Sequence, residues 1–231
     1  MKSLPVFFNK KLYKTHLIKS NDDRKVFLLN LPIKQFLFIL NTFFMFYFLF
    51  KLAGWKVTHQ LPKEVQKCVI IALPHTSNWD FVYAMGALSE MKIKTRFTIK
   101  KEWFKFPFKG LMNKLGALPI DRTKNADGTR KGTVDAMADL FNNRKELLLL
   151  ITPEGTRSRV DKWKTGFYYV ALKAKVPIAL GFIDYAKREC GIDKLIYPTG
   201  NYNADMKLIM DFYKNVIGKN PENFALDTSF E

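Results

Sequence analysis

Two short polar motifs, each directly after an apolar run, contain the residues of this chain best suited to chemistry. The first motif spans residues 74–80 and places a histidine, His75, five positions before a carboxylate, Asp80. The second spans residues 152–158 and offers an acid, a glycine, a hydroxyl and a guanidinium in succession. A neutral histidine is a good general base for an alcohol, and a carboxylate near its far nitrogen fixes its tautomer. Together the motifs favour transfer of an acyl group onto a phosphate-bearing alcohol.

The spacing of His75 and Asp80 suits a turn that enters a helix, with Ser77 or Asn78 as the N-cap residue. A histidine and an aspartate at this spacing are, taken alone, most often a capped helix start with a surface histidine. The sequence contains no G-x-S-x-G nucleophile motif. We therefore expect direct attack by the acceptor alcohol, without an acyl-enzyme.

Charged and polar side chains in the second motif and at the ends of two earlier predicted strands are candidates for holding a phosphate group. Arginine suits this role because its planar fork donates paired hydrogen bonds. Lysines in pairs are as often simply solvated as they are ligand-binding. The candidate phosphate-binding residues are Glu154, Gly155, Thr156, Arg157, Arg122, Lys100 and Lys101.

The elements that must position these residues alternate between strand and helix patterns. Apolar strand candidates are 55–59, 68–73, 95–99, 117–120, 147–152 and 177–183, and helical patterns cover 81–91, 104–115, 134–141, 163–174 and 204–216. Such alternation predicts an α/β fold with a largely parallel central sheet flanked by helices. Both polar motifs follow strands, where functional loops of such sheets lie.

The N-terminal part of the chain predicts an association with membranes. The net charge is +17, and residues 1–35 contain eight Lys/Arg against two acidic residues. A charge-free, Phe-rich run, 35–50, follows and would be roughly 24 Å long as a helix, shorter than a ~30 Å hydrocarbon core. We expect a basic arm (1–30), a hydrophobic helix embedded in one leaflet (31–53) and a catalytic domain (54–231). A single short membrane span is the alternative. This apolar run disfavours nucleic acid as the partner of the positive charge, and anionic membrane lipids are expected instead.

Four blocks in order resemble the lysophosphatidic acid acyltransferase family, the glycerolipid acyltransferases. They are His75 to Asp80, Gly116 to Arg122, Glu154 to Arg157, and Val176 to Ile178. The resemblance covers roughly residues 55–200. It implies a glycerol-phosphate acyltransferase-like fold with a membrane-embedded N-terminal helical element.

The resemblance also implies roles for the four blocks. His75 would be the general base and Asp80 its partner, and Arg122 with the Glu154 block would hold the acceptor's phosphate. Val176, Pro177 and Ile178 would lie on the acyl-donor side. The implied reaction esterifies a lysophospholipid, 1-acylglycerol-3-phosphate, to phosphatidic acid, with acyl-CoA or acyl-carrier protein as donor. No further cofactor and no metal are expected, and the expected location is the cytoplasmic face of the inner membrane.

Two departures from the family pattern leave the acceptor open. Pro74 precedes the histidine where the family commonly has asparagine, and the segment after Arg157 is short. Acylation of another lysolipid, such as an amino-acid-linked one, and transfer between phospholipids are alternatives within the enzyme class. A non-catalytic protein that binds anionic lipids and a nucleic-acid-binding protein are the alternatives from other classes. Cys68 and Cys190 are expected to be reduced thiols.

Overall fold

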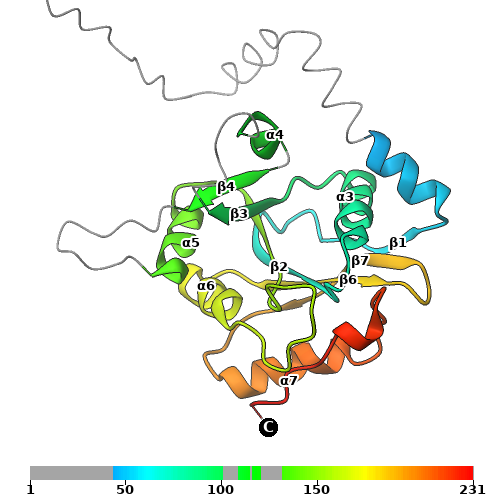
Figure 1. Cartoon of the computed structure of the whole chain (residues 1–231). Coiled ribbons are helices and arrows are strands. Elements are labelled where there is room, and N and C mark those ends of the chain that lie inside the picture. The colour runs from blue at the N-terminus through cyan, green and yellow to red at the C-terminus, as the bar shows by residue number, and fades with distance from the viewer. Residues whose placement is uncertain (1–43, 101–108, 115, 121–131, 231) are drawn as a thin grey trace, which may run out of the picture. The chain divides into compact units, whose positions relative to one another are not determined.

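A seven-stranded sheet organises the part of the chain that the structure, a computed structural model, describes: residues 44–100, 109–114, 116–120 and 132–230 (Figure 1). Its strands are β1 (Lys56–His59), β2 (Lys67–Leu73), β3 (Arg96–Lys100), β4 (Ala117–Ile120), β5 (Leu147–Ile151), β6 (Ile178–Asp184) and β7 (Glu189–Ile196). They lie in the order β1-β7-β6-β2-β5-β3-β4. The α-helices assigned among the described residues from β2 onward are α3 (Trp79–Met91), α4 (Lys109–Lys114), α5 (Thr133–Asn142), α6 (Gly166–Ala174) and α7 (Tyr202–Tyr213).

The sheet is mostly parallel. β2 pairs in parallel with β5 on one side and β6 on the other, and β3 pairs in parallel with β5 and β4. Only the β6–β7 pairing among the described strands is antiparallel, and β1 runs parallel to β7. The predicted α/β fold with a largely parallel sheet flanked by helices is therefore confirmed.

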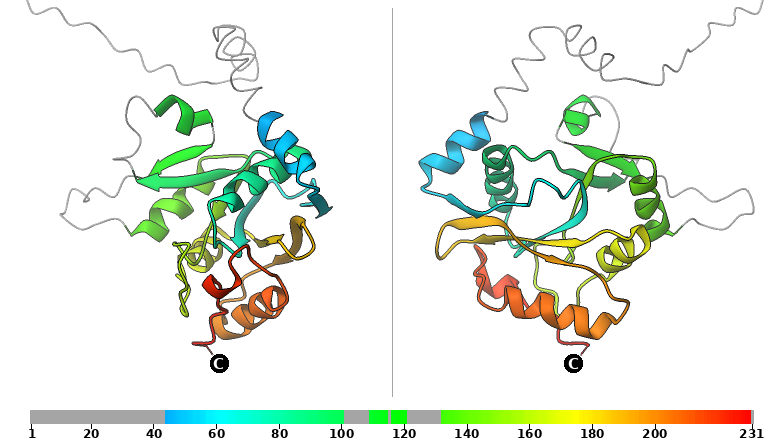
Figure 2. Two further views of the ribbon diagram at one scale, coloured as in Figure 1. Left: turned by 45° about the vertical axis from the view of Figure 1, so that its right-hand side comes forward. Right: turned by 180° about the vertical axis from the view of Figure 1, so that it is seen from behind.

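Alternate side chains of the central strands enter opposite layers of the core. On β2, Val69 and Ile71 pack with residues of α6 and α7, while Cys68 and Ile70 belong to a cluster on the other face. This alternation is the normal consequence of the strand's two-residue period. The helices α5, α6 and α7 thus cover one face and α3 the other, as Figure 2 shows. Because both faces are covered, the central strands are apolar throughout.

A short helix over residues 44–52 precedes β1 and packs against α3. The contact is made at Gly86, where an added Cβ would collide with the Phe50 side chain and the Phe46 carbonyl oxygen. Phe50 and Trp55 are buried in this contact. The predicted arm 1–30 and the first part of the predicted hydrophobic helix, 31–43, lie outside the described residues. Among those that are described, no helix has the length and apolar character needed to cross a bilayer.

Two elements differ clearly from their predictions, and α7, predicted over 204–216, ends at Tyr213. The strand β7 was not predicted, because its run Glu189 to Ile196 mixes charged and apolar residues. It pairs with β6 in an antiparallel hairpin. In the turn between them, Asp184 Oδ1 accepts the N–H groups of Ala186 and Lys187. The helix predicted from Trp163 begins at Gly166 instead. Trp163 is buried in the preceding loop, where its Nε1–H donates to the carbonyl oxygen of Ala225.

Candidate active site

The two polar motifs lie side by side because β2 and β5 are adjacent, parallel and in register. Ile71 on β2 is aligned with Ile151 on β5, so both strands end at the same edge of the sheet. The loop after β2 contains His75, and the loop after β5 contains Glu154. The backbone N–H of His75 donates to Glu154 Oε2 at 3.0 Å, which joins the two loops directly.

His75 and Asp80 form the pair that their spacing predicts. His75 Nδ1 lies 3.4 Å from Asp80 Oδ2, and the aspartate is only 3% exposed. The same Oδ2 accepts the backbone N–H groups of Thr76 and Ser77 at 2.7 and 2.8 Å, so Asp80 closes the turn that starts α3. Asn78 is the N-cap residue, although its side chain makes no capping bond. With Nδ1 facing the carboxylate, Nε2 is the nitrogen left to accept a proton.

Glu154 faces the interior and the His75 loop. It is 4% exposed, and its Oε1 is a buried atom without a hydrogen-bond partner among the described residues. Burial raises the pKa of Glu154 from 4.5 to about 7, the His75 N–H bond lowers it in part, and the charge of Asp80 raises it. The Glu154 carboxyl group therefore supports the His75 loop from the interior by accepting the backbone N–H of His75.

The part of the second motif after Glu154, residues 155–158, is exposed. Gly155 has a φ of +67°, and a side chain there would collide with the end of Lys164. Thr156 and Arg157 follow on the surface, and Lys164 is exposed as well. Positive φ at a glycine lets the chain turn sharply and leaves room for the lysine. The loop therefore presents exposed cations, Arg157 and Lys164 among them, beside the buried acid Glu154.

Two more segments reach the His75 loop from far along the sequence. Tyr185, directly after β6, donates its hydroxyl to Asp80 Oδ1 at 2.7 Å. Asn220, beyond α7, donates its Nδ2–H to the Thr76 carbonyl oxygen at 2.9 Å, and its backbone N–H donates to Thr76 Oγ1 at 3.2 Å. The loop that contains His75 is thus held from three other parts of the chain.

The predicted acyl-donor block is not brought to this loop. Val176, Pro177 and Ile178 lie at the amino end of β6, where Ile178 aligns with Val69 of β2, so they stand at the opposite end of the strands from His75. Val176 and Ile178 are buried core residues. Their assignment to the acyl-donor side stays a prediction. Lys100 ends β3, which is adjacent and parallel to β5, so its backbone lies at the same edge of the sheet as the two motif loops. Lys101 and Arg122 lie outside the described residues.

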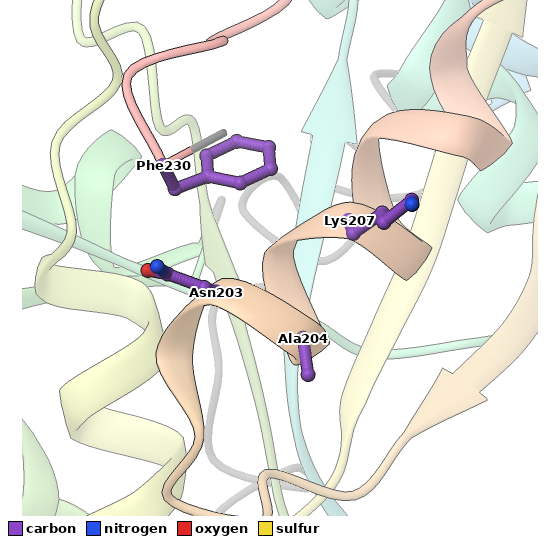
Figure 3. A pocket seen from close by; sticks show the side chains of 4 residues that line it. All are labelled: Asn203, Ala204, Lys207 and Phe230. Carbon is purple, nitrogen blue, oxygen red and sulfur yellow. The ribbon is translucent and has the colours of Figure 1, made fainter.

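A surface depression on α7 is separate from the motif loops. Asn203, Ala204, Lys207 and Phe230 line it (Figure 3). The amino end of α7 follows β7, whose last residue, Ile196, pairs with Ile178 at the amino end of β6. The depression therefore lies toward the edge of the sheet opposite His75, and Lys207 is its one titratable side chain.

Three contributors were missed in the sequence: Tyr185, Asn220 and Lys164. Tyr185 follows a predicted strand of the parallel sheet, and this position is the one signal in the sequence that could have identified it as a candidate. No pattern in the neighbouring sequence indicates that Asn220 or Lys164 belongs to the site. Among the described residues, no group of three or more His, Cys, Asp or Glu side chains is arranged to hold a metal ion.

Comparison with known proteins identifies the family. A comparison with curated proteins gave no significant match. The family model described as Acyltransferase matches residues 55–179, more than half of the chain, from just before β1 to the start of β6. That span includes both polar motifs and the strands that bring them together. The chain therefore belongs to the acyltransferase family, within the glycerolipid acyltransferase superfamily, whose reaction is acyl transfer to a lipid acceptor.

Proposed function

We propose that this acyltransferase moves a fatty acyl group from acyl-CoA or acyl-carrier protein to the free hydroxyl of a lysophospholipid. The proposed acceptor is 1-acylglycerol-3-phosphate, and the product is then phosphatidic acid. The observation that supports it best is the His75–Asp80 pair beside the exposed, cationic loop after Glu154. A base and a phosphate-recognition loop at one sheet edge suit an acceptor that has both a hydroxyl and a phosphate.

The proposed mechanism is a direct attack by the acceptor. His75 Nε2 removes the hydroxyl proton while the oxygen attacks the thioester carbonyl carbon, and a tetrahedral intermediate forms. When the intermediate collapses, the carbon–sulfur bond breaks and the imidazolium returns its proton to the leaving thiolate. Asp80 holds the Nδ1–H tautomer and stabilises the imidazolium. The 3.4 Å separation between Nδ1 and Oδ2 is long for a hydrogen bond, as catalytic contacts often are before substrate binds.

The acceptor's phosphate is proposed to bind over the Gly155 turn. Arg157 supplies a fork of donors to phosphate oxygens, and Lys164 adds a point charge beside the same turn. Arg122 is retained in the proposal from the sequence. Glu154, which the resemblance places among the phosphate-binding residues, is proposed to take a different part, because its carboxyl group is buried and accepts the His75 N–H.

Exposed apolar side chains next to the motif loops support work at a membrane. The helix over residues 44–52 exposes Phe44, Phe48 and Leu52, and the first turn of α3 exposes Trp79 and Phe81. The two groups adjoin, since the rings of Phe46 and Phe81 meet edge to face at 5.8 Å. Such side chains suit the interfacial layer of a bilayer. We propose the cytoplasmic face of the inner membrane as the location, with anionic lipids as partners.

The test is acyl transfer by the purified, detergent-solubilised protein from a labelled acyl thioester. Lysophosphatidic acid is compared with a panel of other lysolipids, and His75→Ala is compared with His59→Ala. His59 is a matched control because it is a half-exposed histidine that lies 3.7 Å from a carboxylate oxygen of Asp193. We expect His75→Ala to lose at least about 10²-fold in kcat and to keep its binding to anionic vesicles. His59→Ala should keep both.

Each outcome is decisive. Labelled phosphatidic acid formed by the wild type and His59→Ala, but not by His75→Ala, supports the reaction and the acceptor. Transfer to another lysolipid, such as an amino-acid-linked one, keeps the mechanism and corrects the substrate. Near-normal turnover by His75→Ala refutes the mechanism. No transfer to any acceptor refutes the enzyme and favours a lipid-binding protein.

A further inference from the structure

Both oxygens of the Asp80 carboxylate accept hydrogen bonds. Its Oδ2 accepts the backbone N–H groups of Thr76 and Ser77 and faces His75 Nδ1. Its Oδ1 accepts one side-chain donor, the hydroxyl of Tyr185, at 2.7 Å. The two oxygens are therefore held by different parts of the chain, one by its own turn and one by the segment after β6.

The ring of Tyr185 is fixed in place by aromatic neighbours. Trp55 meets it edge to face with ring centres 4.9 Å apart, and Tyr83 meets it at 5.9 Å. Its backbone N–H donates to the Ile217 carbonyl oxygen at 2.8 Å. Because both the backbone and the ring of Tyr185 are held by these contacts, its hydroxyl is directed toward Asp80.

The hydroxyl of Tyr185 is a permanent donor. An ionised carboxylate only accepts hydrogen bonds, so the proton belongs to the tyrosine. Burial and the adjacent Asp80 raise the pKa of Tyr185 far above its ordinary value. The tyrosine therefore stays protonated wherever the enzyme is folded and active.

The geometry points to Tyr185 as a positioning residue for the acyl transfer proposed above. Its hydroxyl fixes the rotation of the Asp80 carboxylate, and so keeps Oδ2 facing His75 Nδ1. Without that hydroxyl, Oδ1 is a buried charged acceptor lacking its donor, and the carboxylate reorients toward other donors. The imidazole then loses its fixed tautomer and direction. This inference rests on the proposed function.

The experiment compares Tyr185→Phe with Tyr83→Phe in the acyl-transfer assay. Tyr83 is a matched control because it belongs to the same aromatic cluster, and no hydrogen bond of its hydroxyl is found among the described residues. We expect kcat of Tyr185→Phe to fall about 10- to 100-fold, the range set by a lost hydrogen bond to a charged group. KM for the thioester and the lysolipid should change less than about twofold, because the hydroxyl binds neither substrate. Tyr83→Phe should stay within about twofold of the wild type in both.

A second readout does not depend on activity. The midpoint of thermal unfolding should fall by about 5 °C in Tyr185→Phe, as expected for a bond of this kind in a chain of this size. The same substitution on an Asp80→Ala background should not lower it, since the acceptor is gone. A wild type inactive toward every acceptor refutes the proposed function. The unfolding midpoints of the single and double variants still decide whether Tyr185 and Asp80 are coupled. Three kinetic results overturn the inference: an unchanged kcat in Tyr185→Phe, equal kcat losses in Tyr185→Phe and Tyr83→Phe, or a raised KM with a normal kcat. An equal fall of the unfolding midpoint on the wild-type and Asp80→Ala backgrounds overturns it as well.

Discussion

Glu154 predicts a specific dependence of stability on pH. The residue is almost fully buried, with one oxygen bonded to the His75 N–H and the other lacking a partner among the described residues. Its pKa is raised from 4.5 to about 7, chiefly by burial. Glu154→Gln keeps the shape and a carbonyl oxygen for His75 but cannot ionise. The difference in unfolding free energy between the wild type and this variant isolates the titration of Glu154.

The sign and size of the effect follow from the two pKa values. The folded protein holds the proton of Glu154 more tightly than the unfolded chain, so unfolding releases a proton between about pH 4.5 and 7. The stabilisation is complete below about pH 4.5 and is lost as pH rises through about 7. At 1.36 kcal/mol per pH unit, the separation of the two pKa values corresponds to about 3 kcal/mol.

The assay is urea unfolding of both proteins in the same detergent, from about pH 4.5 to about pH 8.5, followed by the fluorescence of the buried tryptophans Trp55 and Trp163. The unfolding free energy of the wild type minus that of Glu154→Gln should fall by about 3 kcal/mol across this range and flatten above about pH 7. Groups common to both proteins cancel in the difference. A difference that is independent of pH, or that rises with pH, would refute the reasoning about the burial of Glu154.

Two further substitutions test how the site is supported. Gly86→Ala places a Cβ against Phe50 and the Phe46 carbonyl, so we expect a loss of about 1–3 kcal/mol and faster proteolysis within residues 44–54; unchanged protection of that segment would contradict the close packing on α3. Asn220→Ala removes the side-chain bond to the Thr76 carbonyl, so we expect about 1 kcal/mol lower unfolding stability and a reduced kcat. A normal kcat in a measurably destabilised Asn220→Ala would show that the loop keeps its geometry without this bond.

The central strands and the meeting of the two motifs were predictable from sequence. Uninterrupted apolar runs mark strands buried on both faces, and parallel strands bring their carboxyl ends to one edge. These two rules place His75 and the Glu154 loop at one edge of the sheet, and the pairing of β2 with β5 brings them together, joined by a bond at 3.0 Å. The pair His75 and Asp80 was predictable for the same kind of reason, because a helix start closes a five-residue spacing locally.

The remainder of the site depends on tertiary contacts that leave no local pattern. Glu154 reads as a charged turn residue, yet the turn at Gly155 sends its side chain inward. Tyr185 reaches Asp80 only because β6 lies next to β2 in the sheet. Trp163 continues a helical period in the sequence, but bonds to Asp227 and Ala225 hold it outside the helix. Sequence periodicity describes each element alone and is silent on such pairings.

The bonds that hold the His75 loop have a consequence for the order of folding. The bonds made by Glu154, Tyr185 and Asn220 join residues whose separations in the sequence are 79, 105 and 144 positions, respectively. We expect the Asn220 contact, which spans 144 positions, to form after β2 pairs with β5, where Lys67 is aligned with Leu147. A chain that has paired β2 with β5 but has not yet docked the segment around Asn220 has most of its sheet and lacks an ordered base. We therefore expect activity to appear only after the segment around Asn220 has docked on the His75 loop.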